Sequence, residues 1–339
     1  MDQLATNGVH YGVFKDTRFG PASGSPEKRL VLLIPGQGCV PWLATKGECC
    51  TFCRLPAGTR YAVMGDGFEE HFEPWKVNPS DYATMIDTAL ADSAGVDKIT
   101  VFNGGSFLTD REIPKTARQH LYRRFAEHAT ATELMVESRP EFVKADMLDE
   151  MQDITGDKSV MIGIGLESMD DHVRNNVLKK FIGRKSFVTS IETLQKRGLK
   201  TFVYVFLGAP GLTEYEAYLD ARASIQALHA MGVDEIALSC AFVPPGGQLE
   251  QLYRKGEFRP PRLWTIAHLV EEARAKGWPL TVGGFDDFPP PIAVAENCGN
   301  CDPTILAAFD RHRETGAFQC DTTCTCKQSW DAEMELVAV

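Results

Sequence analysis

The chain lacks long apolar runs and an apolar leader. Its longest apolar runs, such as Leu30–Ile34 and Val203–Leu207, fall far short of the roughly 20 residues that a membrane-spanning helix requires. Residues 1–16 include acidic side chains and contain no apolar core of the kind that a secretory signal peptide shows. We therefore expect a cytoplasmic protein that does not enter a membrane.

Positive charge is also scarce. The 339 residues include 46 Asp and Glu against 35 Lys and Arg, which gives a formal net charge of -11. Nucleic-acid binding usually draws on a surplus of basic side chains, so this balance favours a small-molecule substrate over a polyanion. One group of basic residues forms either a local basic patch, which would still permit a nucleic-acid partner, or a solvated helix end and loop. It comprises Lys179, Lys180, Arg184 and Lys185.

Cysteine, by contrast, is abundant. Ten cysteines in a chain without a secretion signal favour metal binding or redox chemistry over a disulfide scaffold. Nine of them fall in two groups, from Cys39 to Cys53 and from Cys298 to Cys326. Cys240 stands alone in an apolar stretch and is interpreted as a core residue.

Short β-branched runs alternate with longer amphipathic stretches, which is typical of a parallel sheet with crossover helices. Candidate strands are Arg29–Ile34, Lys98–Phe102, Glu133–Glu137, Ser159–Leu166, Thr201–Leu207 and Glu235–Ser239. Candidate helices are Ser80–Asp92, Lys115–His128, Glu141–Met151, Phe187–Arg197 and Glu214–Met231. The pattern predicts an α/β fold, a partial (β/α)6 barrel over 28–253. An N-terminal extension covers 1–27, and a Cys-rich C-terminal extension covers 254–339.

The first cysteine group lies in a long loop directly after an apolar strand, where barrel enzymes place their chemistry. The Cys50-x-x-Cys53 pair has the spacing that directs two sulfurs at one iron–sulfur cluster or one zinc ion, and Cys39 can supply a third ligand. Cys49 is a competing ligand. We favour Cys50 because its spacing to Cys53 is regular, whereas a four-thiol zinc site would use both.

Several segments together resemble a known family. GCVPW at Gly38–Trp42 and the later GECCTFC are similar to the widely spaced cluster loop of radical S-adenosylmethionine (SAM) enzymes. The resemblance is to the branch that includes the elongator catalytic subunit and the archaeosine-forming enzymes. Further similar segments, in family order, are NGGSFLTDREIP at Asn103–Pro114, VESRPEFV at Val136–Val143, GLES at Gly165–Ser168, LGAPGLTEYEA at Leu207–Ala217 and NCGNCD at Asn297–Asp302.

The resemblance implies a [4Fe–4S] cluster with one iron left open for SAM, and an electron donor of the flavodoxin or ferredoxin type. It also implies that Gly104, Gly105 and Ser106 receive the amino end of SAM. The same glycines would serve a tight turn between a strand and a helix. The enzyme would be a lyase or a transferase.

Charged residues end the next two predicted strands. A carboxylate at Glu137 could accept hydrogen bonds from SAM, and Arg139 could pair with the SAM carboxylate. Glu167 ends the following strand in an equivalent place. The competing interpretation is a buried Glu–Arg pair that braces the barrel mouth.

The second cysteine group supplies more thiols than one tetrahedral site can use. It comprises Cys298, Cys301, Cys320, Cys324 and Cys326. Three interpretations compete: an auxiliary iron–sulfur cluster, a structural zinc ion, or a mobile thiolate tail that delivers a thiophilic substrate. The first two cysteines resemble the family pattern, and the last three are additional to it.

The leading hypothesis is a radical SAM enzyme that acts on a small molecule in a specialised biosynthetic or detoxifying pathway. One variant transfers a 3-amino-3-carboxypropyl group from SAM to trivalent arsenic held by the tail thiols, as in arsinothricin-type biosynthesis. A second hypothesis is a tRNA nucleoside-modifying radical SAM enzyme. A third is a zinc-binding scaffold without catalytic activity.

Overall fold

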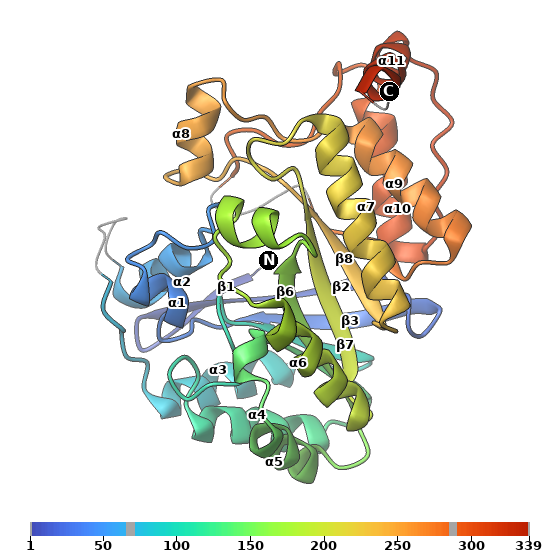
Figure 1. The fold of residues 1–339 in the computed structure, drawn as a ribbon. Helices are drawn as coiled ribbons and strands as arrows, with labels where there is room; N and C mark the ends of the chain where they lie inside the picture. The colour runs from blue at the N-terminus through green and yellow to red at the C-terminus, as the bar shows by residue number, and fades with distance from the viewer. Residues whose placement is uncertain (1, 66–71, 285–289, 338–339) are drawn as a thin grey trace.

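The computed structural model describes residues 2–65, 72–284 and 290–337. In these residues one sheet of nine strands is formed, and its spatial order is the order of the sequence (Figure 1). The strands are β1 (Asp2–Thr6), β2 (Val9–Gly20), β3 (Ser25–Leu33), β4 (Lys98–Phe102), β5 (Glu133–Glu137), β6 (Ser159–Glu167), β7 (Lys200–Leu207), β8 (Glu235–Cys240) and β9 (Leu280–Val282).

The sheet has an antiparallel start and a parallel body. β1, β2 and β3 pair antiparallel, and every later pairing from β3 to β9 is parallel. The α/β prediction is confirmed, and the six predicted strands correspond to β3 through β8. The structure adds β1 and β2 within the predicted N-terminal extension and β9 within the predicted C-terminal extension.

Helices connect the successive parallel strands, because parallel strands need a long crossover connection, and two further helices follow β9. They are α1 (Val40–Ala44), α2 (Leu55–Met64), α3 (Pro79–Ala91), α4 (Lys115–Ala126), α5 (Ala145–Thr155), α6 (Arg184–Lys196), α7 (Glu214–Ala230), α8 (Gln248–Arg254), α9 (Leu263–Lys276), α10 (Asp302–Thr315) and α11 (Thr325–Val337), with a 3-10 turn η1 (Pro140–Phe142) and a π-helical turn η2 (Val173–Val177). The five predicted helices correspond to α3 through α7. α5 begins four residues later than predicted because Pro140 starts the separate turn η1.

The ends of the open sheet are brought together by α10. This helix packs against β2 and β3 near one edge and against β9 at the other. It also packs against α9, and in Figure 1 it lies in the orange and red part of the chain. The C-terminal segment is thus part of the folded body around the sheet. Within the described part of the chain, no helix combines the length and apolar character needed to span a membrane.

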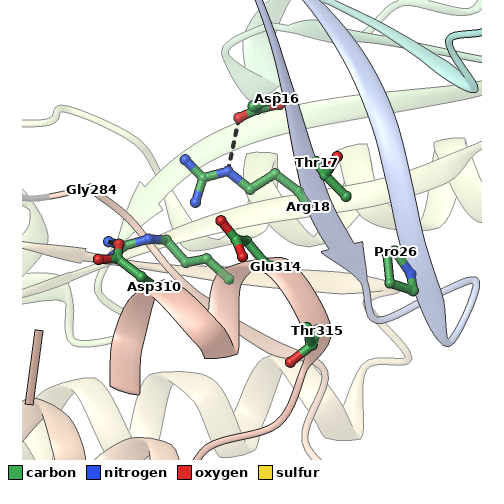
Figure 2. Close-up of a pocket in the computed structure, with 9 residues that line it drawn as sticks. Asp16, Thr17, Arg18, Pro26, Gly284, Asp310, Glu314 and Thr315 are labelled. Carbon is green, nitrogen blue, oxygen red and sulfur yellow. Dashed lines mark hydrogen bonds and ion pairs between the residues drawn. The ribbon is translucent and has the colours of Figure 1, made fainter. Parts of the chain in front are cut away.

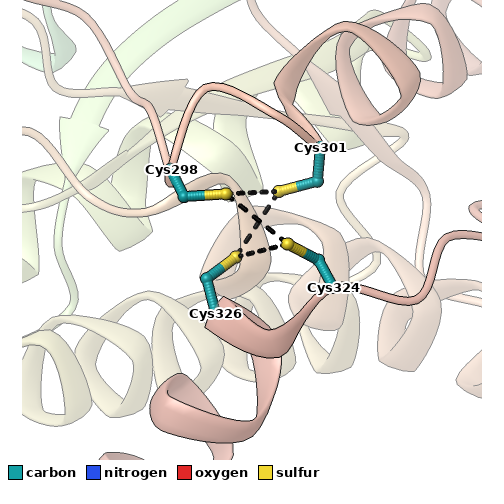
Figure 3. Close-up of side chains that lie close together, drawn as sticks. All are labelled: Cys298, Cys301, Cys324 and Cys326. Atoms are coloured by element: carbon teal, nitrogen blue, oxygen red, sulfur yellow. Dashed lines mark hydrogen bonds between the residues drawn. The ribbon is translucent and has the colours of Figure 1, made fainter.

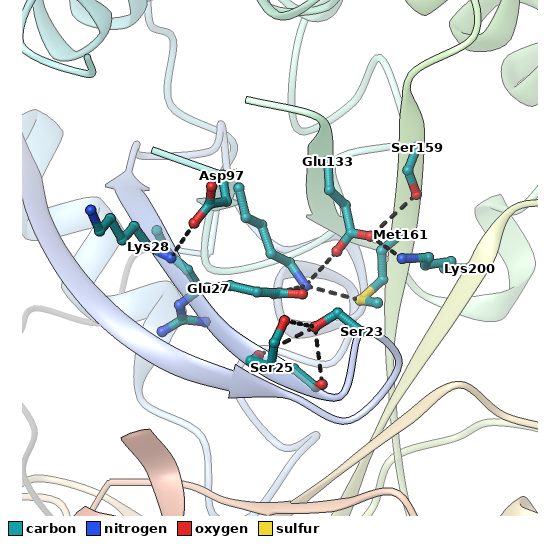
Figure 4. Close-up of polar contacts among 12 residues, drawn as sticks. Ser23, Ser25, Glu27, Lys28, Asp97, Glu133, Ser159, Met161 and Lys200 are labelled. Atoms are coloured by element: carbon teal, nitrogen blue, oxygen red, sulfur yellow. Dashed lines mark hydrogen bonds and ion pairs between the residues drawn. The ribbon is translucent and has the colours of Figure 1, made fainter. Parts of the chain in front are cut away.

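Charged side chains fill the end of the sheet where the parallel strands begin (Figure 4). Lys98 Nζ lies 2.6 Å from Glu133 Oε1, and Lys200 Nζ lies 2.5 Å from Glu133 Oε2. Glu235 is buried beside them, and burial raises the pKa of its carboxyl to about 7. Lys98, Glu133 and Lys200 are thus paired with one another, whereas Glu235 Oε1 has no hydrogen-bond partner among the described residues. The residues predicted to bind the cluster and SAM lie at the opposite end, where the strands finish.

Candidate functional site

The first cysteine group lies where β3 ends, in a loop that two short helices interrupt. Cys39 stands directly before α1, and Cys53 stands just before α2. The Cys50 N–H donates to the Lys179 carbonyl at 3.0 Å, and the Cys53 N–H donates to the Cys50 carbonyl at 2.8 Å. The loop is therefore fastened to the segment that follows β6.

The two adjacent cysteines have different surroundings. Cys49 is 2% exposed and belongs to the main hydrophobic core, whereas Cys39, Cys50 and Cys53 are partly exposed. A hydrogen bond from Cys49, followed by the positive charges of Lys180 and Arg139, lowers the pKa of Cys50 to about 6. Burial raises the pKa of Cys53 to about 12. Cys50 is thus the member of the pair that faces positive charge.

Several residues in and around this loop have strained backbone conformations. Six residues other than glycine have positive φ among those described, and five of them lie here. They are Lys46 (51°), Cys50 (49°), Glu167 (74°), Lys179 (51°) and Phe181 (53°). Such conformations cost about 1–3 kcal/mol each and tend to persist at functional sites. The strain marks the contact between the cysteine loop and the end of β6.

Charged side chains lie beside the thiols, with Lys180, Arg139 and Glu167 near Cys50. Lys180 Nζ donates to Glu167 Oε1 at 2.7 Å, and the Lys180 side chain is only 12% exposed. Burial raises the pKa of Glu137 to about 7, and the Tyr204 hydroxyl is its hydrogen-bond partner. For Lys180 the solvated interpretation is wrong, because the turn after η2 directs this side chain inward and α6 begins only at Arg184.

Arg139 has partners within the protein. Its Nε donates to Glu141 Oε1 at 2.5 Å, and its Nη2 donates to the carbonyls of Lys180 at 3.0 Å and Phe181 at 3.3 Å. The guanidinium therefore braces the segment that carries Lys180. Glu167 pairs with Lys180, and Arg139 pairs with Glu141, whose side chain is 42% exposed. These two pairs differ from the buried Glu–Arg pair of the competing interpretation.

The glycine turn after β4 is tightly enclosed. Gly104 has a φ of 66°, and a Cβ there would come within 2.6 Å of Thr59. A Cβ on Gly105 would come within 1.9 Å of Glu112 Oε2. Ser106 is fully buried, and its hydroxyl accepts a hydrogen bond from the Arg139 N–H at 3.2 Å. Because neither glycine has room for a side chain, a ligand at this turn would meet backbone groups.

Asn103, directly before the glycines, is 1% exposed, and both polar atoms of its amide lack a partner among the described residues. A buried amide without a partner is costly and marks a place where a polar ligand fits. The site thus combines three thiols with neighbouring charged side chains, a glycine turn and this amide. This combination suits an iron–sulfur cluster with a polar cofactor beside it.

Sequence reasoning missed Asn103, Glu112 and the inward role of Lys180. The first two lie inside the Asn103–Pro114 segment, so its polar residues were an available signal. Lys180 carried no such signal, because only the strained turn between η2 and α6 decides its direction.

Four residues of the second cysteine group lie close together, as Figure 3 shows. Sulfur–sulfur distances are 3.8 Å for Cys298–Cys301, 3.5 Å for Cys298–Cys324, 3.5 Å for Cys301–Cys326 and 3.4 Å for Cys324–Cys326. Backbone N–H groups of Cys301 and Asn300 lower the pKa of Cys298 to about 6.

Within the described ranges, this is the one set of three or more Cys, His, Asp or Glu whose ligand atoms all lie within 4.8 Å of one another. Cys320 is outside it. Cys324 and Cys326 thus join Cys298 and Cys301, and not Cys320 as the three-thiol arsenic variant supposed.

A separate polar hollow of about 640 Å³ lies between β2, β3 and the end of α10 (Figure 2). Four of its charged groups are paired, Arg18 with Asp16 and Arg313 with Asp310. None of the predicted site residues lines it.

Comparison with known proteins gives matches over most of the chain. The Radical SAM superfamily model matches residues 47–222. An uncharacterized protein of Methanocaldococcus jannaschii, MJ0550, is 29% identical over 312 residues, which cover 91% of this chain and 82% of that protein. The archaeosine synthase subunit beta of Methanosarcina acetivorans is 26% identical over 324 residues, covering 93% of this chain and 87% of that protein.

Among solved structures, Elp3 of Methanocaldococcus infernus shares the fold. The TM-score is 0.51 at 15% identity, and the match covers 71% of this chain. This chain spans only 60% of that protein. None of the matches described here supports arsenic chemistry.

Proposed function

This chain belongs to the radical SAM superfamily, and we propose that Cys39, Cys50 and Cys53 hold a [4Fe–4S] cluster at which SAM is cleaved reductively. The observation that carries the proposal is that these three partly exposed thiols of one loop lie near one another: burial, and with it the charges of Cys53 and Cys50, raises the pKa of Cys39. Lys180 and Glu167 lie beside Cys50, and the glycine turn lies beside Cys39. Cys49 is left as a core residue.

When bound, the cluster supplies the electron that breaks a carbon–sulfur bond of SAM. The residues of the chain bind and orient. Backbone groups of Gly104 and Gly105 and the unpartnered amide of Asn103 would receive the amino end of SAM. Lys180, whose ammonium is largely buried near Cys50, would pair with the SAM carboxylate. It takes this role in place of Arg139 because Arg139 is paired with Glu141. Glu137 would accept hydrogen bonds from the ribose hydroxyls.

The test is anaerobic reconstitution followed by product analysis under dithionite, which stands in for a donor of the flavodoxin or ferredoxin type. We expect brown protein with iron and sulfide, and 5′-deoxyadenosine from SAM. Methylthioadenosine would instead show that the other carbon–sulfur bond is cleaved, the one that releases the 3-amino-3-carboxypropyl group. Colourless protein that contains zinc in the first loop and leaves SAM intact would contradict the proposal and favour the scaffold hypothesis.

The substrate has two candidate classes. The net charge of -11 favours a small molecule. A tRNA nucleoside is the second candidate, favoured by similarity over 93% of the chain to a protein named archaeosine synthase subunit beta. Binding of total tRNA at several salt concentrations separates them. Binding that weakens steeply with salt supports the tRNA substrate, and no binding at low salt removes it.

We also propose that the four C-terminal thiols hold one zinc ion. Four sulfurs at the Zn–S distance of about 2.3 Å form a tetrahedron whose edges are about 3.8 Å. The observed separations of 3.4 to 3.8 Å suit a single ion better than a four-iron cluster, which is bulkier. Metal analysis of protein purified without added metal tests this, with one zinc per chain expected.

A further inference from the structure

A buried carboxylate, that of Glu112, lies between the cysteine loop and the glycine turn. Glu112 is fully buried in the connection between β4 and α4. Its Oε1 accepts from the Val40 N–H at 2.9 Å, and its Oε2 accepts from the Ser106 N–H at 2.5 Å. Val40 follows Cys39 directly, and Ser106 ends the glycine turn. One carboxylate therefore touches the backbone of both segments.

The main chain of Glu112 adds a third contact, because its carbonyl accepts from the Gln37 N–H at 2.8 Å. Gln37 lies two residues before Cys39, so Glu112 holds the loop on both sides of this cysteine. These contacts add to the direct backbone bond from the Gly36 N–H to the Asn103 carbonyl at 3.1 Å, which joins the same two segments before Cys39.

The fit around the carboxylate is close. A Cβ on Gly105 would lie 1.9 Å from Glu112 Oε2 and 3.5 Å from the Cys39 Cα. The carboxylate thus fills the space that any side chain at position 105 would need. Glycine at this position is explained by Glu112 as well as by the turn itself.

Burial of a carboxylate is costly unless its hydrogen bonds are made. An apolar residue at position 112 would leave the Val40 and Ser106 N–H groups without acceptors, and a neutral amide can accept only one of the two bonds. A glutamate therefore suits this position, because its two oxygens accept one hydrogen bond from the loop and one from the turn.

We propose that Glu112 is a positioning residue that sets the place of Cys39 relative to the backbone of the glycine turn. The inference rests on the proposed function, since it assigns the cluster to one segment and the amino end of SAM to the other. Loosening the bridge should weaken SAM binding even where the cluster is still assembled.

The test compares Glu112→Gln and Glu112→Asp with the wild type, each reconstituted anaerobically. Gln loses one of the two bonds, and Asp keeps the charge but is shorter by one methylene. We expect folded protein with the wild-type circular dichroism spectrum, and a dissociation constant for SAM raised about tenfold, which is about 1.4 kcal/mol. The measurements are iron and sulfide content, equilibrium dialysis with SAM and the electron paramagnetic resonance spectrum of the reduced cluster with and without SAM.

The matched control is Glu150→Gln, which removes a carboxylate paired with Lys115 on the α4–α5 surface. Its SAM affinity should equal that of the wild type. Wild-type SAM affinity and spectra in both Glu112 variants would overturn the inference while leaving the proposed function intact. A wild-type protein without cluster or SAM cleavage would instead remove the proposed function.

A second measurement tests whether the carboxylate and the glycine turn are energetically coupled. Gly105→Ala should weaken SAM binding because the new Cβ meets the carboxylate, and Glu112→Asp should relieve that contact. In the double variant we therefore expect SAM affinity above that of Gly105→Ala alone. Purely additive losses, or no affinity loss in Gly105→Ala, would show that the carboxylate and the turn are not coupled and would overturn the inference.

Discussion

Cys49 and Cys50 are neighbours in the chain with opposite surroundings, one in the core and the other facing Lys180 and Arg139. We expect Cys50→Ala to retain less than about a tenth of the wild-type iron, because a cluster ligand is lost. Cys49→Ala should keep its iron and lose about 1 kcal/mol of unfolding free energy from the small core cavity. Iron and sulfide analysis after reconstitution checks this, and the reverse order would move the ligand to Cys49.

Lys180 pairs with the buried Glu167 and lies near Cys50, so its removal should affect both stability and the cluster. Lys180→Met leaves the buried Glu167 carboxylate without its partner, so the free energy of unfolding should fall by about 3–5 kcal/mol. Loss of positive charge near Cys50 should also lower the reduction potential of the cluster. Urea unfolding and a redox titration measure the two effects.

Lys179→Met is the matched control for that substitution, since it removes the same charge one residue earlier. Its unfolding free energy should change by no more than about 0.5 kcal/mol. Equal losses in the two variants would contradict a specific role for the Lys180–Glu167 pair.

At the scale of elements, α11 is held at its start by the four-thiol group. Cys326 lies in its first turn, where Trp264 Nε1 donates to the sulfur at 3.2 Å, and Trp330 Nε1 donates to Thr265 Oγ1 at 2.8 Å. We expect Cys324→Ser to lose most of its zinc and to become sensitive to protease in the segment around 319–334, while the barrel resists cleavage.

Cys320→Ser is the control for this prediction, because Cys320 lies outside the group of four. It should keep one zinc per chain and the wild-type proteolysis pattern. Zinc loss in Cys320→Ser equal to that in Cys324→Ser would show that the grouping differs from the one described.

At the scale of the whole molecule, the charged end of the sheet links strands from β4 to β8, and Glu235 makes its stability depend on pH. The folded pKa of about 7 exceeds the unfolded value near 4.3, so the folded state binds more protons between these values. Stability from this group is present in full below about pH 4 and falls as pH rises to about 7, by about 4 kcal/mol in all.

Glu235→Gln removes the titrating group, so its unfolding free energy should fall less than that of the wild type between pH 5 and pH 8. Urea unfolding at both pH values measures the difference. Glu127→Gln, on the exposed end of α4, should follow the wild-type curve. Parallel curves for wild type and Glu235→Gln would show that the Glu235 pKa is not raised by burial.

The sequence by itself determined the strands β3 to β8 and the helices α3 to α7, because buried strands and amphipathic helices repeat over distances of a few residues. It also identified the loop that carries Cys39, Cys50 and Cys53, since ligand spacing is local. The three-residue strand β9 was not visible in this way: Leu280–Val282 is too short for a period, and only pairing with β8 makes it a strand.

The tertiary structure alone decided which thiols and charges meet. Cys324 reaches Cys298 only because α10 turns the chain back over the 25 residues between them, a contact that no local spacing encodes. Lys180 turns inward because the strained turn before α6 directs it to Glu167. Glu112 joins the loop and the glycine turn because β3 and β4 are paired in register, and pairing is a property of the folded sheet rather than of either segment.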